Sequence, residues 1–182
     1  MPSLHELGFG FFKLGEEAFV DLESFTLAGK KMKGYRAVKN KFERENYSIE
    51  LLCPPYSTEV MNELEDVSTK WLQGRVEKGF SLGFFDKNYL NTSKVAVLRD
   101  KEGIIGFASL MPMYDCDERI SVDLMRFKPG APYGTMDFIF LSLFDWAKEQ
   151  GYLIFNIGMS PLSNVGQFKF SFLSEKVAAK IV

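Results

Sequence analysis

The sequence predicts an α/β protein in which a mixed, mostly antiparallel sheet carries helices on both faces. Two kinds of segment predict this class. Apolar residues recur at helical spacing in 57–73 and 136–150. Shorter runs rich in Val, Ile, Leu and Phe lie around these helices and are bounded by turn residues. Because helical and strand segments alternate along the chain, we expect helices packed against both sides of one sheet.

The first half of the chain is expected to form strands and two helices. Pro54-Pro55 ends one strand, and Ser57 or Thr58 is expected to cap the helix that follows it. In chain order, the expected elements are short strands within 11–22, a basic helix over 30–45, a strand at 48–52, a helix ending at about Gln73 and a loop over 74–91.

The second half is expected to contain a three-stranded meander followed by a buried helix. Thr135 is expected to cap that helix, which is apolar almost all round and therefore central. The expected elements are strands at 94–99, 104–111 and 120–126, a helix over 136–150, a strand at 153–157, a loop over 158–166 and a last helix from about Gln167. A meander, a crossover helix and a parallel strand in this order resemble the core of GNAT-type acyltransferases.

Composition excludes several kinds of site. The only histidine is His5, which removes Ser-His-Asp, Cys-His and His-rich zinc chemistry, so that acid–base work falls to Asp, Glu, Lys or Tyr. Cys53 and Cys116 lie far apart in no metal-ligand spacing, and a reduced setting fits them better than one disulfide. With no signal peptide and no apolar run near the ~20 residues of a membrane span, we expect a soluble chain.

Basic residues gather in one segment, although the net charge of the whole chain is -2. Between Ala28 and Asn46, seven lysines and arginines stand against two glutamates. Such a segment could contact phosphate groups, and a solvated helix face explains it about as well. The candidate binding residues here are Lys30, Lys31 and Arg36.

Asp123 and Arg126 stand three residues apart in an expected strand. Aspartate is depleted in strands, and buried charges are costly unless they are paired or used. Because side chains alternate along a strand, these two would face opposite sides unless a bulge intervenes or the strand ends near Met125. We therefore expect a bulge or a strand end that turns both side chains toward one cleft. A structural ion pair without chemistry is the alternative.

Two loops bear on the choice of ligand. The 126–134 segment has two prolines, which supply no N–H groups, and it lacks the Arg/Gln-x-x-Gly-x-Gly/Ala spacing of coenzyme A loops in GNAT enzymes. We therefore expect neither coenzyme A nor any other cofactor or metal ion. The second segment lies at the carboxyl end of the 153–157 strand, where Asn156 and Ser160 could hydrogen-bond a substrate. The alternative is that these side chains only form a turn and cap a helix.

Six segments, in order across nearly the whole chain, carry a family resemblance. They are Phe12–Leu22, Gly29–Gly34, Lys78–Asp86, Ser121–Arg126, Gly134–Phe138 and Asn156–Leu162. Together they resemble the C-terminal domain of bacterial phosphatidylglycerol lysyltransferases of the multiple-peptide-resistance-factor type. In that family a tandem of GNAT-like domains uses aminoacyl-tRNA as donor and phosphatidylglycerol as acceptor, and an N-terminal membrane-spanning region flips the product.

The resemblance implies a function and roles for residues. The chain would be one GNAT-like domain over 1–182, part of a longer enzyme, with a lead-in over 1–52 and an acyltransferase core over 53–182. It would help transfer lysine to phosphatidylglycerol at the cytoplasmic face of the cell membrane, which lowers membrane negative charge and gives resistance to cationic antimicrobial peptides. Asp123 would bind the lysyl ammonium or the attacking hydroxyl, and Arg126 would face phosphate or developing negative charge. The 30–44 helix would touch tRNA or lipid phosphate.

Other readings stay open at this point. A related tRNA-dependent transferase that adds amino acids to a peptidoglycan precursor shares the donor and the fold. A non-catalytic part that only binds tRNA or membrane is a second alternative, and an acyl-CoA N-acetyltransferase is a third. The sequence does not separate lysine from alanine or arginine as the transferred residue.

Overall fold

The computed structural model describes residues 6–10, 12–77, 83–113, 118–161, 163–167 and 171–173. The chain divides into two compact units, residues 20–156 and residues 1–19 with 157–182. The helix expected from about Gln167 falls almost wholly outside the described residues. The single domain expected over 1–182, with a lead-in over 1–52 and a core over 53–182, stays a prediction.

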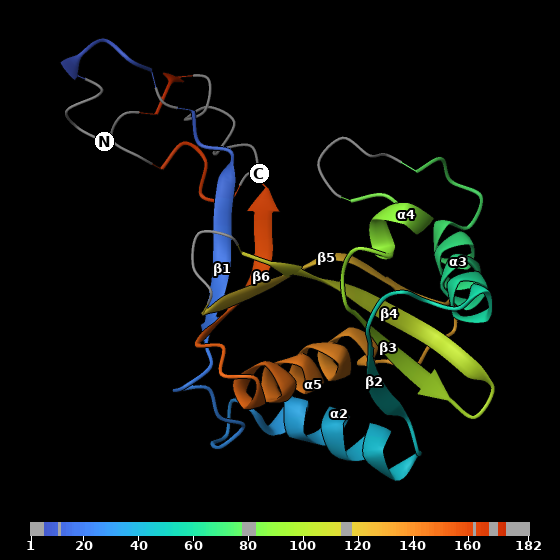
Figure 1. Ribbon diagram of the computed structural model, residues 1–182. Coiled ribbons are helices and arrows are strands. Elements are labelled where there is room, and N and C mark those ends of the chain that lie inside the picture. Colours follow the sequence, from blue (N-terminus) through green and yellow to red (C-terminus); the bar gives the residue numbers. More distant parts are fainter. Residues whose placement is uncertain are drawn as a thin grey trace. The chain divides into compact units, whose positions relative to one another are not determined.

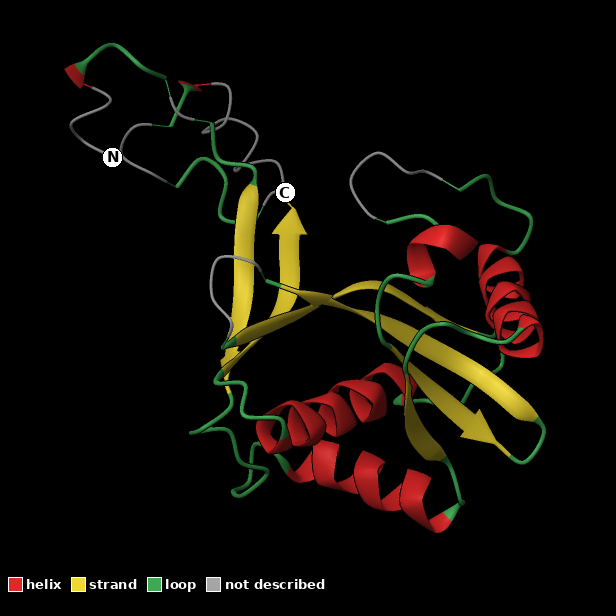
Figure 2. Ribbon diagram, in the orientation of Figure 1, coloured by secondary structure: helices red, strands yellow, loops and turns green. Residues whose placement is uncertain are grey.

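A six-stranded sheet has the order β1-β6-β5-β4-β3-β2 (Figure 2). Its strands are β1 (Gly15–Asp21), β2 (Ser48–Leu52), β3 (Val95–Asp100), β4 (Gly103–Pro112), β5 (Arg119–Phe127) and β6 (Ile154–Pro161). From β2 to β5 neighbouring strands are antiparallel, and β6 runs parallel to β5, with Ile120 beside Phe155. The mixed, mostly antiparallel sheet predicted from the sequence is therefore confirmed, with the GNAT-like order of meander, helix and parallel strand.

Helices cover both faces of this sheet (Figure 1). On one face, α2 (Lys33–Arg44) packs on α5 (Thr135–Glu149), which in turn contacts β3 and β4. On the other face, α3 (Thr58–Leu72) contacts β4 and β5, and the short α4 (Lys87–Leu90) lies nearby. The predicted layering is confirmed.

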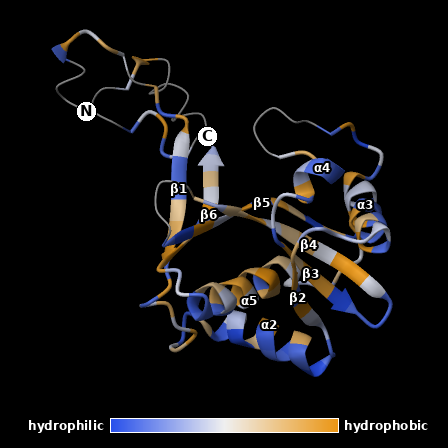
Figure 3. Ribbon diagram, in the orientation of Figure 1, coloured by the Kyte–Doolittle hydropathy of each residue, from blue (hydrophilic) through white to orange (hydrophobic). Residues whose placement is uncertain are grey.

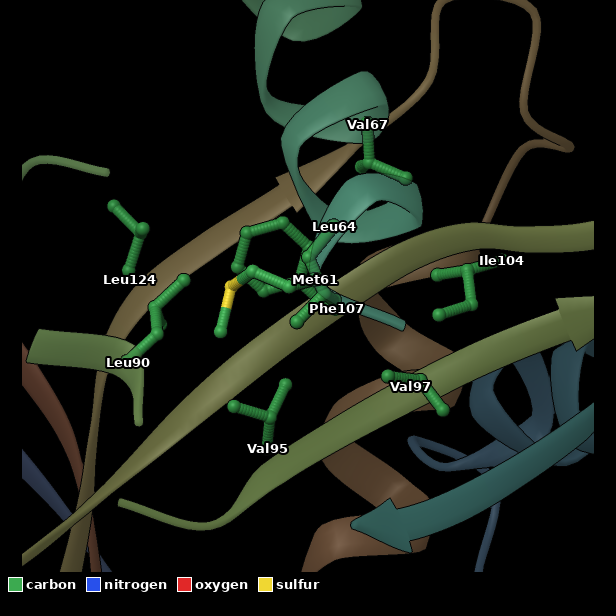
Figure 4. Packing of buried hydrophobic residues seen from close by; sticks show 9 residues of the cluster. All are labelled: Met61, Leu64, Val67, Leu90, Val95, Val97, Ile104, Phe107 and Leu124. Carbon is green, nitrogen blue, oxygen red and sulfur yellow. The ribbon is translucent and has the colours of Figure 1, made fainter. Parts of the chain in front are cut away.

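The α3 helix forms because its local signals and its apolar positions agree. The Ser57 side chain caps it by accepting a hydrogen bond from the N–H of Val60, and Glu59 lies in the first turn, where the helix dipole favours negative charge. Met61, Leu64 and Val67 recur every three residues and are buried. They pack against side chains of the sheet, as Figure 4 shows: Val95, Val97, Ile104, Phe107 and Leu124.

The α5 helix is buried from two sides, as its apolar composition predicts. Phe138 stacks on Phe42 of α2 with 4.7 Å between ring centroids, and Ile139 is fully buried. Figure 3 shows the apolar residues of α5 beside a largely hydrophilic α2. The expected cap at Thr135 is wrong. Thr135 is already helical and its hydroxyl donates to the carbonyl of Pro132, while Gly134, with φ 91°, occupies the N-cap.

Three boundaries differ from the sequence-based expectation. The turn at 29–32 delays α2 until Lys33, because Gly29 takes a φ of 87°. Within the expected loop 74–91, Asp86 caps α4 by accepting from the N–H of Tyr89 at 2.7 Å. The last strand, β6, continues to Pro161 and shortens the expected loop that follows it. Among the described residues, no helix has the length and apolar character that a membrane span requires.

Candidate functional site

The β5 strand contains a bulge beside the predicted site. Phe107 of β4 lies opposite Arg126 and Ala108 opposite Met125, but Leu110 lies opposite Val122. One residue of β4 therefore faces two of β5, Asp123 and Leu124. The extra residue is accommodated because the side chain of Ser109, 1% exposed, accepts a hydrogen bond from the N–H of Leu124 at 3.0 Å. The predicted bulge is confirmed, and β5 continues past Met125 to Phe127.

Asp123 and Arg126 line the same cavity, as the sequence analysis expected. Its volume is about 630 Å³, within the range of sites for small ligands. Leu124 and Met125 complete the part formed by β5. The other lining residues come from the end of α3 and the segment after it: Trp71, Leu72, Arg75, Val76, Glu77 and Gly83.

The Asp123 carboxylate is held by Tyr89 and has room beside Gly83. Tyr89, which α4 positions, donates its hydroxyl hydrogen to Oδ2 of Asp123 at 2.9 Å. Burial and the neighbouring Asp123 raise the pKa of Tyr89 to about 12, so its hydroxyl remains a donor at neutral pH. Gly83 leaves room for the carboxylate, because a Cβ there would lie 2.8 Å from Oδ1. The anionic group is thus fixed at the cavity wall.

Arg126 is buried and held by three groups. It is 2% exposed, its guanidinium donates to the hydroxyl of Ser68 and to the carboxylate of Glu77, and its Cζ lies 4.9 Å from the ring centroid of Trp71. Its Nε is buried and has no hydrogen-bond partner within the part of the chain that the structure describes. Unmet hydrogen-bonding capacity of this kind is uncommon in folded proteins and calls for an explanation.

Glu77 supplies the charge that compensates Arg126. Its Oε1 also accepts from the N–H of Phe85 at 2.9 Å, so it ties the segment after Gly83 to β5. Burial raises the pKa of Glu77, but the hydrogen bonds from Arg126 and Phe85 outweigh it, and the pKa lies below its ordinary value. Glu77 is therefore a carboxylate, and Arg126 sits in a charge-balanced pair.

Sequence reasoning missed Glu77, Tyr89 and the site role of Trp71. Trp71 fits the apolar pattern of α3, and that pattern alone does not separate a core residue from one that lines a cavity. Glu77 and Tyr89 fall in a segment expected to be loop. Their position in the sequence could have pointed to them, because Glu77 and Tyr89 flank the 78–86 segment that carries part of the family resemblance.

The other predicted binding residues lie outside this cavity. Lys30 and Lys31 are exposed in the turn that precedes α2, and α2 lies on the face of the sheet opposite α3 (Figure 1). Arg36 donates to the carbonyls of Leu27 and Gly29 and so holds that turn. Their binding roles stay predictions.

The two predicted residues of β6 have different surroundings. Asn156 is 4% exposed, and its carbonyl accepts from the hydroxyl of Ser121 on β5 at 3.2 Å. Ser160 is exposed and belongs to the other compact unit. Among the described residues no group of three or more His, Cys, Asp or Glu could hold a metal ion, and the thiol of Cys53 is free.

The family model described as "Phosphatidylglycerol lysyltransferase, C-terminal" matches residues 1–182. The chain belongs to this family. It is 52% identical over its whole length to the phosphatidylglycerol lysyltransferase of Bacillus subtilis (strain 168) and 48% identical to that of Staphylococcus aureus (strain COL). The chain covers 21% and 22% of those proteins, so it spans about a fifth of the curated relatives it matches.

A solved structure supports the same assignment. The structure of L-PGS from Bacillus licheniformis matches with a TM-score of 0.83 and 54% identity, over 92% of this chain and 54% of that one. The resemblance drawn from the six sequence segments and the predicted fold class are therefore confirmed.

Proposed function

We propose that this chain is the part of a longer enzyme in which lysine passes from lysyl-tRNA to phosphatidylglycerol. The observation that carries the proposal is the β5 bulge, which brings an anionic and a cationic side chain, Asp123 and Arg126, to one cavity. Membership in the family and the names of its relatives support the substrates. The lysyl lipid would lower the negative charge of the membrane and so reduce binding of cationic antimicrobial peptides.

The reaction exchanges one ester for another. A glycerol hydroxyl oxygen of the lipid attacks the carbonyl carbon of the lysyl ester and loses its proton. The bond between that carbon and the ribose oxygen of tRNA breaks, and the ribose oxygen takes up a proton. Because aminoacyl-tRNA already carries an activated ester, this exchange balances without coenzyme A and without a redox partner. We therefore propose aminoacyl-tRNA as the only co-substrate.

Asp123 and Arg126 have different roles because their charges are opposite. Asp123, fixed by Tyr89, binds an ammonium group of the lysyl residue. Arg126, held by Ser68 and Glu77, offers hydrogen-bond donors to the negative charge that develops on the carbonyl oxygen. Holding the lysyl ester and the lipid hydroxyl together in one cavity increases the reaction rate further.

The partners follow from the reaction. Lysyl-tRNA comes from the cytoplasm and the acceptor is an anionic lipid, so we place the whole protein at the cytoplasmic face of the membrane. An N-terminal membrane-spanning region that flips the product would belong to the rest of that protein. The chain's length relative to its relatives leaves room for it.

The test replaces Asp123 by Asn in the longer enzyme and measures lysyl-phosphatidylglycerol formed from charged tRNA. Asn keeps the shape of the side chain but not its charge, and we expect kcat/KM to fall about 100-fold, mostly through a higher KM for lysyl-tRNA. Asp145→Asn is the matched control, because Asp145 of α5 pairs with Lys39 of α2 and does not line the cavity. Transfer to a peptidoglycan precursor instead of the lipid, or full activity of Asp123→Asn, would contradict the proposal.

A further inference from the structure

Apart from the contact of Trp71 with Arg126, one part of the cavity has no role in the lysyl chemistry described so far. There the last turn of α3 and the segment after it contribute Trp71, Arg75 and Val76. The guanidinium of Arg75 lies 5.5 Å from the ring centroid of Trp71, and that of Arg126 lies 4.9 Å from the same centroid. Three planar groups, two of them cationic, therefore gather at this part of the wall.

Arg75 is fixed although it is exposed. Its Nε donates to the carbonyl of Leu72 at 3.0 Å and its Nη2 to the carbonyl of Trp71 at 3.2 Å. These bonds satisfy carbonyls at the end of α3, which is a structural reason for an arginine there. They also hold the plane of its guanidinium at the cavity rim before any ligand arrives, and such preorganisation reduces the entropic cost of binding.

Planar aromatic and guanidinium groups together suit one class of ligand. Unpaired nucleobases stack on aromatic side chains and on arginine planes, and arginine also binds phosphate. The headgroup of phosphatidylglycerol has no planar group to stack. The chemistry of this wall therefore favours a nucleotide over the lipid.

We propose that Trp71 and Arg75 form a subsite for the terminal nucleotide of the donor tRNA, whose base stacks on them. The inference rests on the proposed function. The lysyl group is esterified to the ribose of that nucleotide, so the nucleoside must bind within one ester linkage of the lysyl carbonyl. A subsite in the same cavity as Asp123 and Arg126 meets this requirement.

The first experiment uses the two tryptophans of the chain, Trp71 and Trp146. Trp146 lies on α5 with the amino group of Lys94 5.6 Å from its ring, away from the cavity. In the longer enzyme, the fluorescence that Trp71→Phe removes and the control Trp146→Phe does not therefore belongs to Trp71. Adenosine monophosphate should quench its fluorescence saturably, and ribose 5-phosphate, which lacks the base, should not. Equal quenching by ribose 5-phosphate, or quenching by glycerophosphoglycerol but not by the nucleotide, would overturn the proposal.

The second experiment measures affinity and kinetics in matched variants. Arg75→Ala should weaken adenosine monophosphate binding about tenfold, as the loss of ~1.4 kcal/mol gives. Lys148→Ala is the control, because Lys148, like Arg75, is an exposed cation near the C-terminal end of a helix and donates to a backbone carbonyl, that of Glu23 at 3.4 Å. It should leave binding unchanged.

In the longer enzyme, Trp71→Leu should raise KM for lysyl-tRNA about tenfold and leave KM for phosphatidylglycerol unchanged. Trp146→Leu is the control and should change neither. Because Trp71 also contacts Arg126, a fall in kcat without this rise in KM would show that Trp71 only positions Arg126 and would overturn the subsite. Unchanged KM for lysyl-tRNA in Trp71→Leu would overturn the subsite while the proposed function stands. Nucleotide binding by an enzyme that makes no lysyl lipid would instead overturn the proposed function.

Discussion

At the scale of single residues, the buried pair of Arg126 and Glu77 decides how the site is charged. A buried arginine without a partner would be costly, and Glu77 compensates it while binding the N–H of Phe85. Arg126 can therefore act as a fixed donor of hydrogen bonds rather than as a free cation. The same pair makes the stability of the protein depend on pH.

Glu77→Gln tests this pair through the free energy of unfolding. Because the pKa of Glu77 is lowered in the folded state, its stabilising effect is present above its ordinary pKa and is lost as pH falls through the folded value. At neutral pH the variant should be less stable by up to about 3 kcal/mol. That deficit should shrink in urea titrations carried out below about pH 5.

The control for this titration is Glu65→Gln. Glu65 pairs with Lys87 at 2.7 Å on the exposed surface, where an ion pair contributes about 0–1 kcal/mol. Its stability should stay within about 1 kcal/mol of the wild type at every pH. A deficit of Glu77→Gln that does not change with pH would show that Glu77 is not held as a carboxylate by Arg126.

At the scale of elements, the bulge in β5 shows what a sequence can and cannot reveal. The period-two alternation of a strand and two charges three residues apart predicted either a bulge or a strand end near Met125, and the structure has the bulge. The Thr135 cap failed because Gly134, with its positive φ, already provides the start of α5, where a Cβ would meet Val38 of α2. Periodicity could not identify Glu77, because it marks no loop residue whose partner lies 49 positions away.

Ser109→Ala tests whether the bulge depends on one buried hydrogen bond. The variant leaves the N–H of Leu124 without its acceptor, and a buried unpaired donor costs about 1–3 kcal/mol. We expect a loss of unfolding free energy in that range and a fall in lysyl transfer, because Asp123 and Arg126 lose their shared orientation. Ser24→Ala, at an exposed turn, should change stability by less than about 0.5 kcal/mol. Unchanged transfer in Ser109→Ala would show that other contacts hold the bulge.

At the scale of the compact unit 20–156, the sheet separates two kinds of surface. The cavity is lined by residues at the end of α3. The exposed Lys30 and Lys31 directly precede α2, which lies on the face of the sheet opposite α3 (Figure 1). These lysines therefore cannot contact the lysyl ester. If they bind tRNA, they contact its phosphate backbone at a distance from the reacting end, and such contacts contribute affinity without base recognition.

Removing both cations, with Lys30→Ala and Lys31→Ala together, should weaken tRNA binding and flatten its dependence on salt. Each lost phosphate contact reduces the slope of log K against log salt by about 0.7–0.9. Binding of adenosine monophosphate at Trp71 should stay unchanged, because that subsite lies across the sheet. Lys101→Ala, an exposed lysine in the β3–β4 hairpin, is the control and should keep the wild-type slope. Filter binding over a series of salt concentrations measures the tRNA affinity and its dependence on salt. The double variant could instead keep the wild-type slope and bind phosphatidylglycerol vesicles as the wild type does. That result would show that the turn before α2 is only a solvated surface, and this chain would then bind tRNA through the cavity face.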